Sequence, residues 1–455
     1  MKLLLQNLRI VDESTDMTGS VLVEEGTVTE VIPAGTHHSY ISGGAAVTID
    51  GGMFALGHTP VLMPAFVDLH AHFRDPGYPE KETLESASLA AAAGGYGTVV
   101  CMANTNPVID TFNAALSLKK RSDALGLIDL YPAMSLTQGM AGKILSDITY
   151  LSPPGTEFPV RMLSEDGKDL TDDALLRAAF SEAYRLGIPV SCHCDAGGLD
   201  AQTAKQAGAP REVWSRLEEN HATQRAIALG KEARCHVHIA HVSTREAVEL
   251  IRQAKAEISV DRDSAGNDKD AFTLTCEATP HHLGLTQENA NLLGAESWGR
   301  VNPPLRTEAD RQALMAAILD GTIDAIATDH APHTEADKAG GAPGFTGLET
   351  GFGVCRTELV REDRLGLSRL SALMSAVPAR ILGLRDRGRI APGFRADLAL
   401  VDTEAVWQAA PESFKSRGKN SPFTGRCLTG KVLMTMYRGQ IVFGCQLPPC
   451  LKAGA

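Results

Sequence analysis

Two histidines in the stretch DLHAHFRDPG stand two residues apart, at the end of an apolar run. Alternate residues of a β-strand point to the same side, so His70 and His72 would face one way, as would Asp68 and Arg74. Two imidazoles placed like this can share one metal ion. The alternative is one histidine in the core and one in solvent. The stretch predicts one wall of a metal site with an arginine beside it.

Further polar residues follow other apolar runs in the middle of the chain. They are Asn104, Asp166, His193, His241, Asn302, Asp329 and His333. A carboxylate can join two cations through its two oxygens, which suits Asp166 in SEDG. His193 and His241 would then serve the second cation. His241 is preferred to His236 and His238 because it stands at the end of its apolar run.

These residue types predict metal-assisted hydrolysis. Nitrogen and oxygen donors without a thiolate favour Zn²⁺ or a similar divalent ion. Two such ions sharing a water would lower its pKa and polarise a carbonyl. Asp329 in ATDHAPH can contact the metal and also accept a proton from water, as general base and then general acid. A structural zinc cluster at Cys192 to Cys194 is disfavoured, because no second Cys/His pair stands at finger spacing.

Eight apolar runs carry these residues, and a polar cluster follows each. The runs span 63–73, 96–106, 128–136, 158–167, 188–196, 235–243, 272–282 and 323–333. Helical patterns lie between most of them, such as the alanine-rich segment that begins after Thr83 and stops at Gly94. Strands alternating with helices predict an α/β fold, a (β/α)₈ barrel of TIM type. Active groups in such a barrel lie at the carboxyl ends of the strands.

Both ends of the chain are β-rich instead. Residues 1–62 and 386–455 predict short strands and turns without a helical period. We expect one small β-sandwich domain formed by both chain ends, beside a barrel domain at residues 63–385. The polar stretch 257–272 predicts an exposed excursion before the seventh barrel strand.

Composition restricts the partners of the protein. The chain has 455 residues, 22% of them charged, and a net charge of −12. This charge argues against nucleic acid and anionic membranes, so an anionic substrate would have to be attracted by local cations. No apolar run approaches the length of a membrane span, and the start MKLLLQNLRIVDESTD lacks a signal-peptide pattern. We expect a cytoplasmic protein whose nine cysteines are reduced thiols.

Several stretches together resemble one family. DLHAHFRDPG, SEDG, ATPHHLGLT, NPPLR and ATDHAPHTEADK, with GRIAPGFRADLALVD and NSPFTGR further on, resemble the longer, class I dihydroorotases of bacteria. These enzymes belong to the amidohydrolase superfamily, and the resemblance spans about residues 60–445. It implies zinc-dependent, reversible cyclisation of N-carbamoyl-L-aspartate to L-dihydroorotate, a step of de novo pyrimidine biosynthesis.

The resemblance also implies roles for single residues. Two zinc ions per chain would be held by His70, His72 and Asp166, and by Asp166, His193 and His241. Asp329 would be a ligand that doubles as general base. Substrate would be bound by Arg74, Asn104, Asn302, His333 and the backbone around Pro343 and Gly344. The product carries a carboxylate, which an arginine can bind through two parallel hydrogen bonds.

Two alternatives remain open at this stage. Allantoinases, dihydropyrimidinases and related cyclic-amide hydrolases bridge their metals with a carbamylated lysine after the fourth strand. Here Arg161 stands near that position, and a guanidinium does not form the carbamate, so Asp166 favours the dihydroorotases. A non-catalytic barrel that serves as a scaffold for aspartate transcarbamoylase would have lost metal ligands, and this chain keeps them. We predict a homodimer and leave a complex with aspartate transcarbamoylase open.

Overall fold

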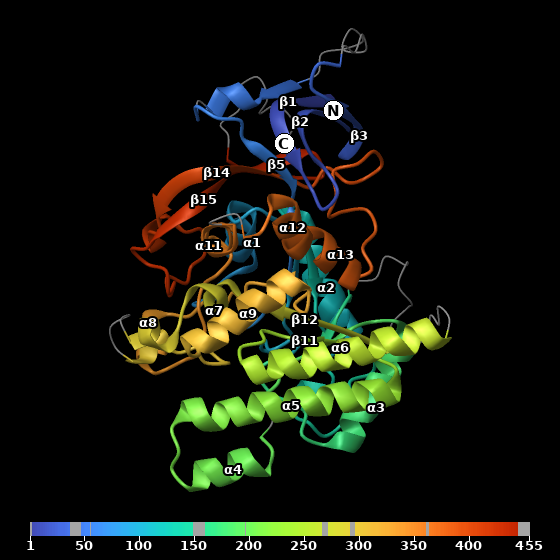
Figure 1. Cartoon of the computed structure of the whole chain (residues 1–455), viewed down its shortest axis with the longest axis vertical. Coiled ribbons are helices and arrows are strands. Elements are labelled where there is room, and N and C mark those ends of the chain that lie inside the picture. The colour runs from blue at the N-terminus through green and yellow to red at the C-terminus, as the bar shows by residue number, and fades with distance from the viewer. Residues whose placement is uncertain are drawn as a thin grey trace.

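The computed structural model describes residues 2–36, 47–54, 56–148, 160–195, 197–265, 272–291, 296–360 and 364–444. Figure 1 shows a sheet at the top of the view and, below it, helices packed around a second group of strands. The lower part comes from the middle of the chain and the upper part from both ends.

Eight parallel strands form the lower part, and each lies within one of the predicted apolar runs. They are β6 (Phe66–Ala71), β7 (Tyr96–Cys101), β8 (Asp129–Pro132), β9 (Leu163–Ser164), β10 (Val190–Cys192), β11 (His236–Ile239), β12 (Thr273–Ala278) and β13 (Ala325–Ile326). Their neighbours follow the chain, as β6-β7-β8 and β9-β10-β11-β12-β13. Parallel bridges between Met134 and Leu163 and between Ala71 and His330 join the two groups at both seams. The predicted (β/α)₈ barrel is confirmed.

Helices follow the barrel strands along the chain. The longer ones are α1 (Leu84–Ala93), α2 (Phe112–Leu125), α3 (Asp173–Leu186), α4 (Leu199–Gln206), α5 (Arg211–Ala233), α6 (Arg245–Ala265), α9 (Glu308–Asp320) and α11 (Gly351–Leu359). Shorter ones are α7 (Pro280–Gly284), α8 (Gln287–Asn291), α10 (Glu335–Ala339), α12 (Leu367–Ser371) and α13 (Val377–Ile381). α1 begins and ends as predicted: the Thr83 hydroxyl accepts a hydrogen bond from the Ser86 N–H, and Gly94 is the C-cap.

The polar stretch 257–272 differs from the excursion that we predicted. α6 continues into it, and Ile258 packs against the barrel core seven residues after the buried Ile251. That spacing returns to the same face of a helix, so the apolar stripe continues although the residues around it are charged. Phe272 is buried as well. Residues 266–271 lie outside the described part of the chain.

Strands from both chain ends form one sheet with its own apolar core. They are β1 (Lys2–Val11), β2 (Asp16–Glu24), β3 (Thr27–Pro33), β4 (Val47–Asp50), β5 (Val61–Pro64), β14 (Leu398–Gln408), β15 (Cys427–Tyr437) and β16 (Gln440–Gly444). The order is β16-β15-β14-β5-β1-β2-β3, with β4 on β1. Leu5, Ile49 and Leu398 are among the residues that share the core. The predicted fold class, with a small β-sandwich domain formed by both chain ends, is confirmed.

The exact domain boundaries stay a prediction. The proposed limit between residues 62 and 63 falls inside β5, which pairs with β1 and with β14. β5 therefore belongs to the sheet of the chain ends over its whole length.

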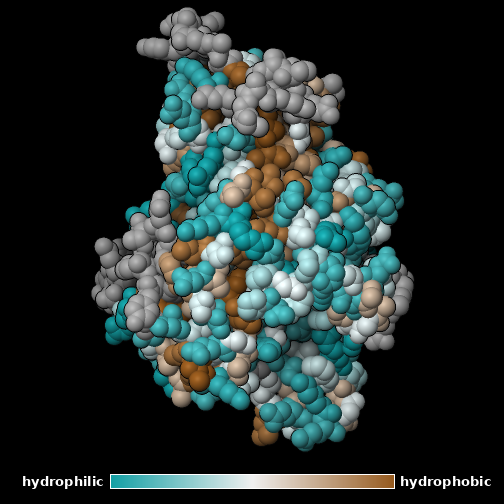
Figure 2. Space-filling view, turned by 180° about the vertical axis from the view of Figure 1, so that it is seen from behind, coloured by the Kyte–Doolittle hydropathy of each residue, from teal (hydrophilic) through white to brown (hydrophobic). Residues whose placement is uncertain are grey.

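The surface seen in Figure 2 is mostly hydrophilic, and the cysteines of the described part of the chain are unpaired with one another. Seen from behind, hydrophilic residues cover most of the molecule, and hydrophobic ones gather in a vertical strip near the centre of the view (Figure 2). In the described part of the chain, no helix has both the length and the apolar character needed to cross a bilayer. The cysteines described there, from Cys101 to Cys427, are free thiols.

The helix α9 offers a test of the packing around the barrel. Ile318 is fully buried in the barrel core, whereas its neighbour Leu319 is 49% exposed. We expect Ile318→Ala to lower the free energy of unfolding by about 2–5 kcal/mol, because it leaves a cavity. Leu319→Ala should change it by roughly 0.5 kcal/mol or less. Urea titration followed by circular dichroism measures both, and equal losses would contradict this packing of α9.

Candidate metal centre

The six residues predicted to bind metal come together at one end of the barrel. All of them are buried and stand at or just after the carboxyl end of a barrel strand: His70, His72, Asp166, His193, His241 and Asp329. They come from five different strands, β6, β9, β10, β11 and β13. Their convergence follows from the closed parallel barrel, which gathers the carboxyl ends of its strands at one face.

The Asp166 carboxylate lies at the middle of this group. Its Oδ1 is 3.2 Å from His70 Nε2 and 3.2 Å from His193 Nδ1. His241 Nε2 is 3.8 Å from the same oxygen, and His72 Nε2 is 3.5 Å from Oδ2. Two triads therefore share Asp166, one with His70 and His72 and one with His193 and His241, and each brings its ligand atoms within 4.8 Å of one another.

The hydrogen bonds on the outer side of the imidazoles indicate what the inner nitrogens face. His70 Nδ1 lies 3.1 Å from Glu277 Oε1, and His72 Nδ1 lies 3.0 Å from Asn104 Oδ1. A proton on each outer nitrogen satisfies these acceptors and leaves a lone pair on the inner nitrogen. That lone pair then points at a carboxylate oxygen, a contact that needs a cation between the two atoms.

Two buried atoms support the same conclusion. His70 Nε2 and Asp166 Oδ1 are both buried and lack a hydrogen-bond partner among the described residues. Burial opposes charge on His70, yet the Asp166 charge raises the pKa of His70 well above its ordinary value. Either a second proton on the imidazole or a metal ion can meet this need. Nitrogen and oxygen donors of this kind fit a divalent metal ion.

Asp166 and Asp329 are both ionised in this environment. Burial alone would raise the pKa of each carboxyl group, but the neighbouring histidines outweigh it. The charges of His70 and His193 hold the pKa of Asp166 well below its ordinary value. The contact with His72 and the charge of His70 likewise outweigh burial and hold the pKa of Asp329 well below its ordinary value. Asp329 Oδ1 lies 3.2 Å from His72 Nε2, so it stands at the edge of the first triad.

Three residues at this end of the barrel have a strained backbone. Arg74, His241 and Asp329 have φ angles of +58°, +33° and +47°. Residues other than glycine seldom adopt this left-handed backbone conformation, and each such residue costs on the order of 1–3 kcal/mol of folding free energy. The surrounding contacts of the site offset this cost.

Glu277 is a residue of the site that sequence reasoning missed. It is the second-last residue of strand β12, is fully buried, and binds two histidines, His70 and His238, through its two oxygens at 3.1 and 3.0 Å. Burial raises the pKa of Glu277, but hydrogen bonds from His238 and His70 outweigh it and lower the pKa to about 2. A glutamate inside the apolar run FTLTCEATPHH was the available signal.

Asp68 was noticed in the sequence without a role. Its carboxylate accepts hydrogen bonds from the Thr328 N–H at 2.9 Å and from the Thr328 hydroxyl at 2.5 Å. The contact joins the first strand of the barrel to the segment after the last one. Burial raises the pKa of Asp68 to about 7, against the hydrogen bonds from Thr328.

Arg74 and His333, predicted to bind substrate, stand next to each other. Arg74 Nη2 is 3.2 Å from His333 Nε2, which is also 2.9 Å from the Pro343 carbonyl oxygen. Burial and the Arg74 charge lower the pKa of His333 to about 3, so the imidazole is neutral. If Nε2 carries the single proton, it donates to Pro343 and cannot accept from Arg74. Among the described residues, Arg74 forms no ion pair with a carboxylate, and its other contact is the Pro332 carbonyl at 3.3 Å.

The two predicted asparagines contact the histidines directly. Asn104 bonds His72, as above, and Asn302 Nδ2 lies 3.1 Å from His193 Nε2. Arg211, which no motif indicated, donates to Asn302 Oδ1 at 3.1 Å and so points the amide nitrogen toward His193. Asp195 Oδ2 lies 3.0 Å from the same His193 Nε2, so a carboxylate orients this imidazole and Asn302 lies beside the pair, and the predicted contacts of both asparagines with substrate stay a prediction.

Gly344 is held against His333 by the C-terminal part of the chain. Asn420 donates to the carbonyls of Ala331 and Gly344 at 3.0 and 3.1 Å and accepts from the His333 N–H at 3.1 Å. A Cβ at Gly344, whose φ is +133°, would lie 2.7 Å from the Ala331 side chain. The site therefore needs glycine at this position and a residue 76 positions away to fix its loop.

This barrel and buried histidine–aspartate cluster define the class of metal-dependent barrel hydrolases. A model of the amidohydrolase family matches residues 61–442. The chain belongs to the amidohydrolase family. The expectation of a hydrolase acting on cyclic amides, and the resemblance to dihydroorotases, are confirmed.

Within the amidohydrolase family, the chain is similar to several dihydroorotases. The chain is 36% identical to a dihydroorotase of Clostridium botulinum, covering 97% of this chain and 100% of the relative. It is 35% identical to a dihydroorotase of Lactiplantibacillus plantarum, over 98% and 99%. Among solved structures, the L-hydantoinase (dihydropyrimidinase) of Arthrobacter aurescens is similar with a TM-score of 0.78 and 27% identity, over 97% and 96% of the two chains.

Glu277 provides a test of the metal centre. We expect the wild type to bind two divalent ions per chain. Glu277→Gln should weaken zinc binding about 10–100-fold, because the amide offers one acceptor where two histidines need one each. Competition with a chromogenic chelator measures the affinity, and elemental analysis counts the ions. Glu249→Gln, on the exposed face of α6, is the control. Equal affinities in both variants, or one ion at full activity, would contradict the shared centre.

Proposed function

We propose that this protein is a dihydroorotase, which interconverts N-carbamoyl-L-aspartate and L-dihydroorotate in de novo pyrimidine biosynthesis. The observation that carries the proposal is Arg74, a cation next to the centre without a carboxylate partner in the described part of the chain. A substrate with its own carboxylate would supply the missing partner. The names of the relatives point to the same reaction.

The metal ions would be two zinc ions, both bound by Asp166. His70 and His72 would complete one site, and His193 and His241 the other. When bound, such ions lower the pKa of water and polarise an amide carbonyl. Glu277 and Asn104 would keep the imidazoles in the tautomer that presents a lone pair inward.

Asp329 would move the proton. It is ionised, buried and 3.2 Å from His72 Nε2, so its free oxygen can accept a proton from the attacking water. In ring opening, the same carboxyl group then gives the proton to the leaving ring nitrogen. In ring closure, it takes the proton from the attacking carbamoyl nitrogen.

The substrate would be oriented from the side of Arg74. The guanidinium donates from Nε to the Pro332 carbonyl, and His333 Nε2 is committed to the Pro343 carbonyl, so hydrogens remain on Nη1 and Nη2. These two nitrogens match the two oxygens of a carboxylate. The rest of the ring would be surrounded by Asn104, Asn302, His333 and the backbone at Pro343 and Gly344, with Asn104 also holding His72 in place.

A hydantoinase or dihydropyrimidinase activity is the second candidate, favoured by the structural likeness to the Arthrobacter aurescens protein. Two observations weigh against it. Asp166 occupies the centre, where allantoinases and dihydropyrimidinases would need a carbamylated lysine. Arg161 does not fill that place, because it stands before β9, at the opposite end of the barrel from the centre.

The setting of the enzyme follows from the same proposal. Free thiols from Cys101 to Cys427 suit a reducing, cytoplasmic compartment. The convergence of six candidate ligands favours a working enzyme over a scaffold barrel. A homodimer and a complex with aspartate transcarbamoylase stay predictions.

Substrate choice tests the proposal. With zinc supplied, we expect turnover of dihydroorotate to exceed that of hydantoin, dihydrouracil and allantoin by at least about 100-fold in kcat/KM, followed by absorbance. Arg74→Gln should cut kcat/KM for dihydroorotate about 10–100-fold, since it loses a charge-assisted pair. Arg121→Gln, which removes an exposed arginine bound to the neighbouring Asp75, should leave it unchanged. Preference for hydantoin or dihydrouracil would overturn the assignment.

The role of Asp329 can be separated from metal binding. Asp329→Asn should lower kcat about 10²–10⁴-fold, because the amide cannot accept the proton. Elemental analysis should still find two ions per chain. The control is Asp320→Asn, at the exposed end of α9. A nearly normal kcat in a fully metal-loaded Asp329 variant would rule out this proton transfer.

A further inference from the structure

A large cavity lies at the other end of the barrel. Its volume is about 1080 Å³, and it opens beside the amino ends of four neighbouring strands. Asp129 begins β8, Arg161 stands two residues before β9, Pro189 precedes β10, and His236 begins β11. None of the residues of the candidate metal centre lines it. This cavity is therefore separate from the site of the proposed reaction.

The cavity is strongly basic although the protein is acidic. Eight lysines and arginines line it, against three aspartates. Glu13 and Asp397 pair with lining arginines from outside the cavity. Cations still exceed carboxylates by three, in a chain whose net charge is −12. Such a local reversal of charge does not follow from composition.

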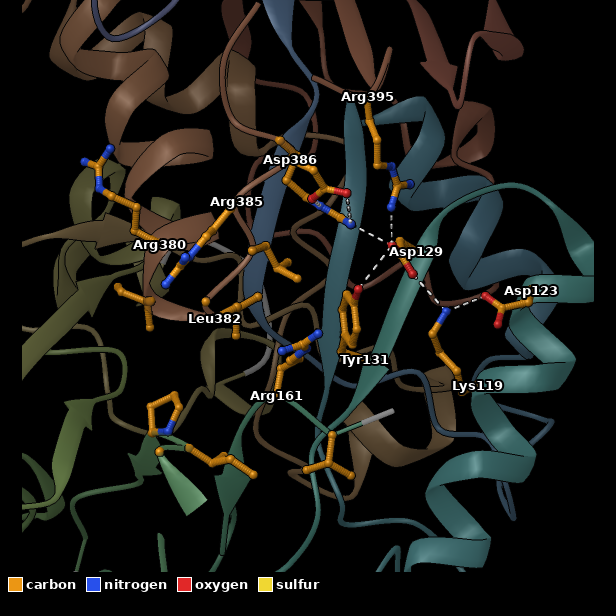
Figure 3. A pocket seen from close by; sticks show the side chains of 18 of the residues that line it. Lys119, Asp123, Asp129, Tyr131, Arg161, Arg380, Leu382, Arg385, Asp386 and Arg395 are labelled. Atoms are coloured by element: carbon orange, nitrogen blue, oxygen red, sulfur yellow. Dashed lines mark hydrogen bonds and ion pairs between the residues drawn. The ribbon is translucent and has the colours of Figure 1, made fainter. Parts of the chain in front are cut away.

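One side of the cavity is already neutralised. Asp129 accepts from Lys119 at 2.8 Å, from Arg387 at 2.6 Å and from Arg395 at 2.7 Å. Figure 3 shows this cluster on the right, joined by dashed lines. Because one carboxylate serves three cations, it has no capacity left for the arginines on the opposite wall.

The opposite wall holds the unpaired cations. In Figure 3, Arg161 and Arg385 face the open space without a dashed line to any residue drawn. Arg161 Nε is buried without a hydrogen-bond partner among the described residues, and its guanidinium lies 5.8 Å from the Tyr131 ring. Lys120 and Arg438 also line the cavity. Within the described ranges, no carboxylate pairs with the side chains of Lys120, Arg161, Arg385 or Arg438.

Apolar side chains complete the lining. Leu116, Val160, Ile188, Leu382 and Leu384 lie between the charged groups. A volume of this size fits a small organic molecule rather than a lone ion. Arg161 Nε is buried without a hydrogen-bond partner in the described part of the chain, which costs free energy that an anionic ligand would recover, whereas Lys120, Arg385 and Arg438 are exposed.

We propose that this cavity binds a phosphorylated organic molecule with at least two anionic groups. Arg161 and Arg385 would grip the phosphates, since guanidinium matches phosphate oxygens through two parallel hydrogen bonds. Lys120 and Arg438 would add charge at the rim, and the apolar side chains would contact the organic part. The segment from Arg380 to Arg395 joins the barrel to β14, so the ligand would sit at the junction of the barrel and the sheet of the chain ends.

Calorimetric titration of the full-length, metal-loaded protein with inorganic pyrophosphate tests this site. We expect one pyrophosphate per chain, bound at least about tenfold more tightly than inorganic phosphate, because two anionic groups engage two separate cations. The double variant Arg161→Gln/Arg385→Gln should weaken pyrophosphate binding at least about tenfold. Lys120→Gln, an exposed change on α2, should weaken it in the same direction without touching the interior.

The control is a second double variant with the same change of net charge, Arg177→Gln/Arg252→Gln, on the outer helices α3 and α6. It should keep the wild-type affinity. Because both pairs leave the metal centre intact, pyrophosphate bound at the metal ions would show equal affinity in both. Equal affinities, no binding to the wild type at millimolar concentration, or no preference over phosphate would each overturn the proposal. The readout is binding, so its failure is distinct from failure of the proposed reaction.

Discussion

A single buried carboxylate surrounded by four imidazoles is the contact on which the site depends. Asp166 lies within 3.8 Å of a nitrogen from each of His70, His72, His193 and His241. A carboxylate so far from water is stable only if positive charge compensates it, whether from protons or from metal ions. The hydrogen bonds around the imidazoles are consistent with this need for positive charge. Glu277 and Asn104 take the outer protons of two imidazoles, and the inner lone pairs are left to face a cation.

The barrel brings the residues of the candidate metal centre together at one point. Its parallel strands end at one face, and Asp68, bonded to Thr328, joins the first strand to the segment after the last. Arg74, His241 and Asp329 accept a strained backbone there, with positive φ angles. A fold held at both seams can carry such strain, because the cost is shared with many packed residues. Asn420 brings the C-terminal segment into the same arrangement.

The two ends of the barrel treat charge in opposite ways. At the carboxyl ends of the strands, carboxylates and imidazoles converge, and the nearby cation Arg74 has no carboxylate partner in the described part of the chain. At the amino ends, Asp129 neutralises Lys119, Arg387 and Arg395, while Arg161 and Arg385 face an open cavity (Figure 3). Both ends could draw anions to an acidic protein, since short-range cations outweigh a weak global field inside a cleft.

The sequence by itself determined the barrel and the six candidate ligands, because strand alternation and the polar ends of apolar runs are local patterns. His70 and His72 illustrate this, since their spacing alone puts them on one side of a strand. Tertiary structure decided what local patterns do not contain. Glu277 and Asn420 act through partners far away in the chain, and Ile258 continues a stripe that its charged neighbours concealed. Arg161 was considered beside the metals, yet it lies at the opposite end of the barrel. Which end of a strand a residue occupies depends on where pairing begins, and only the closed barrel decides that.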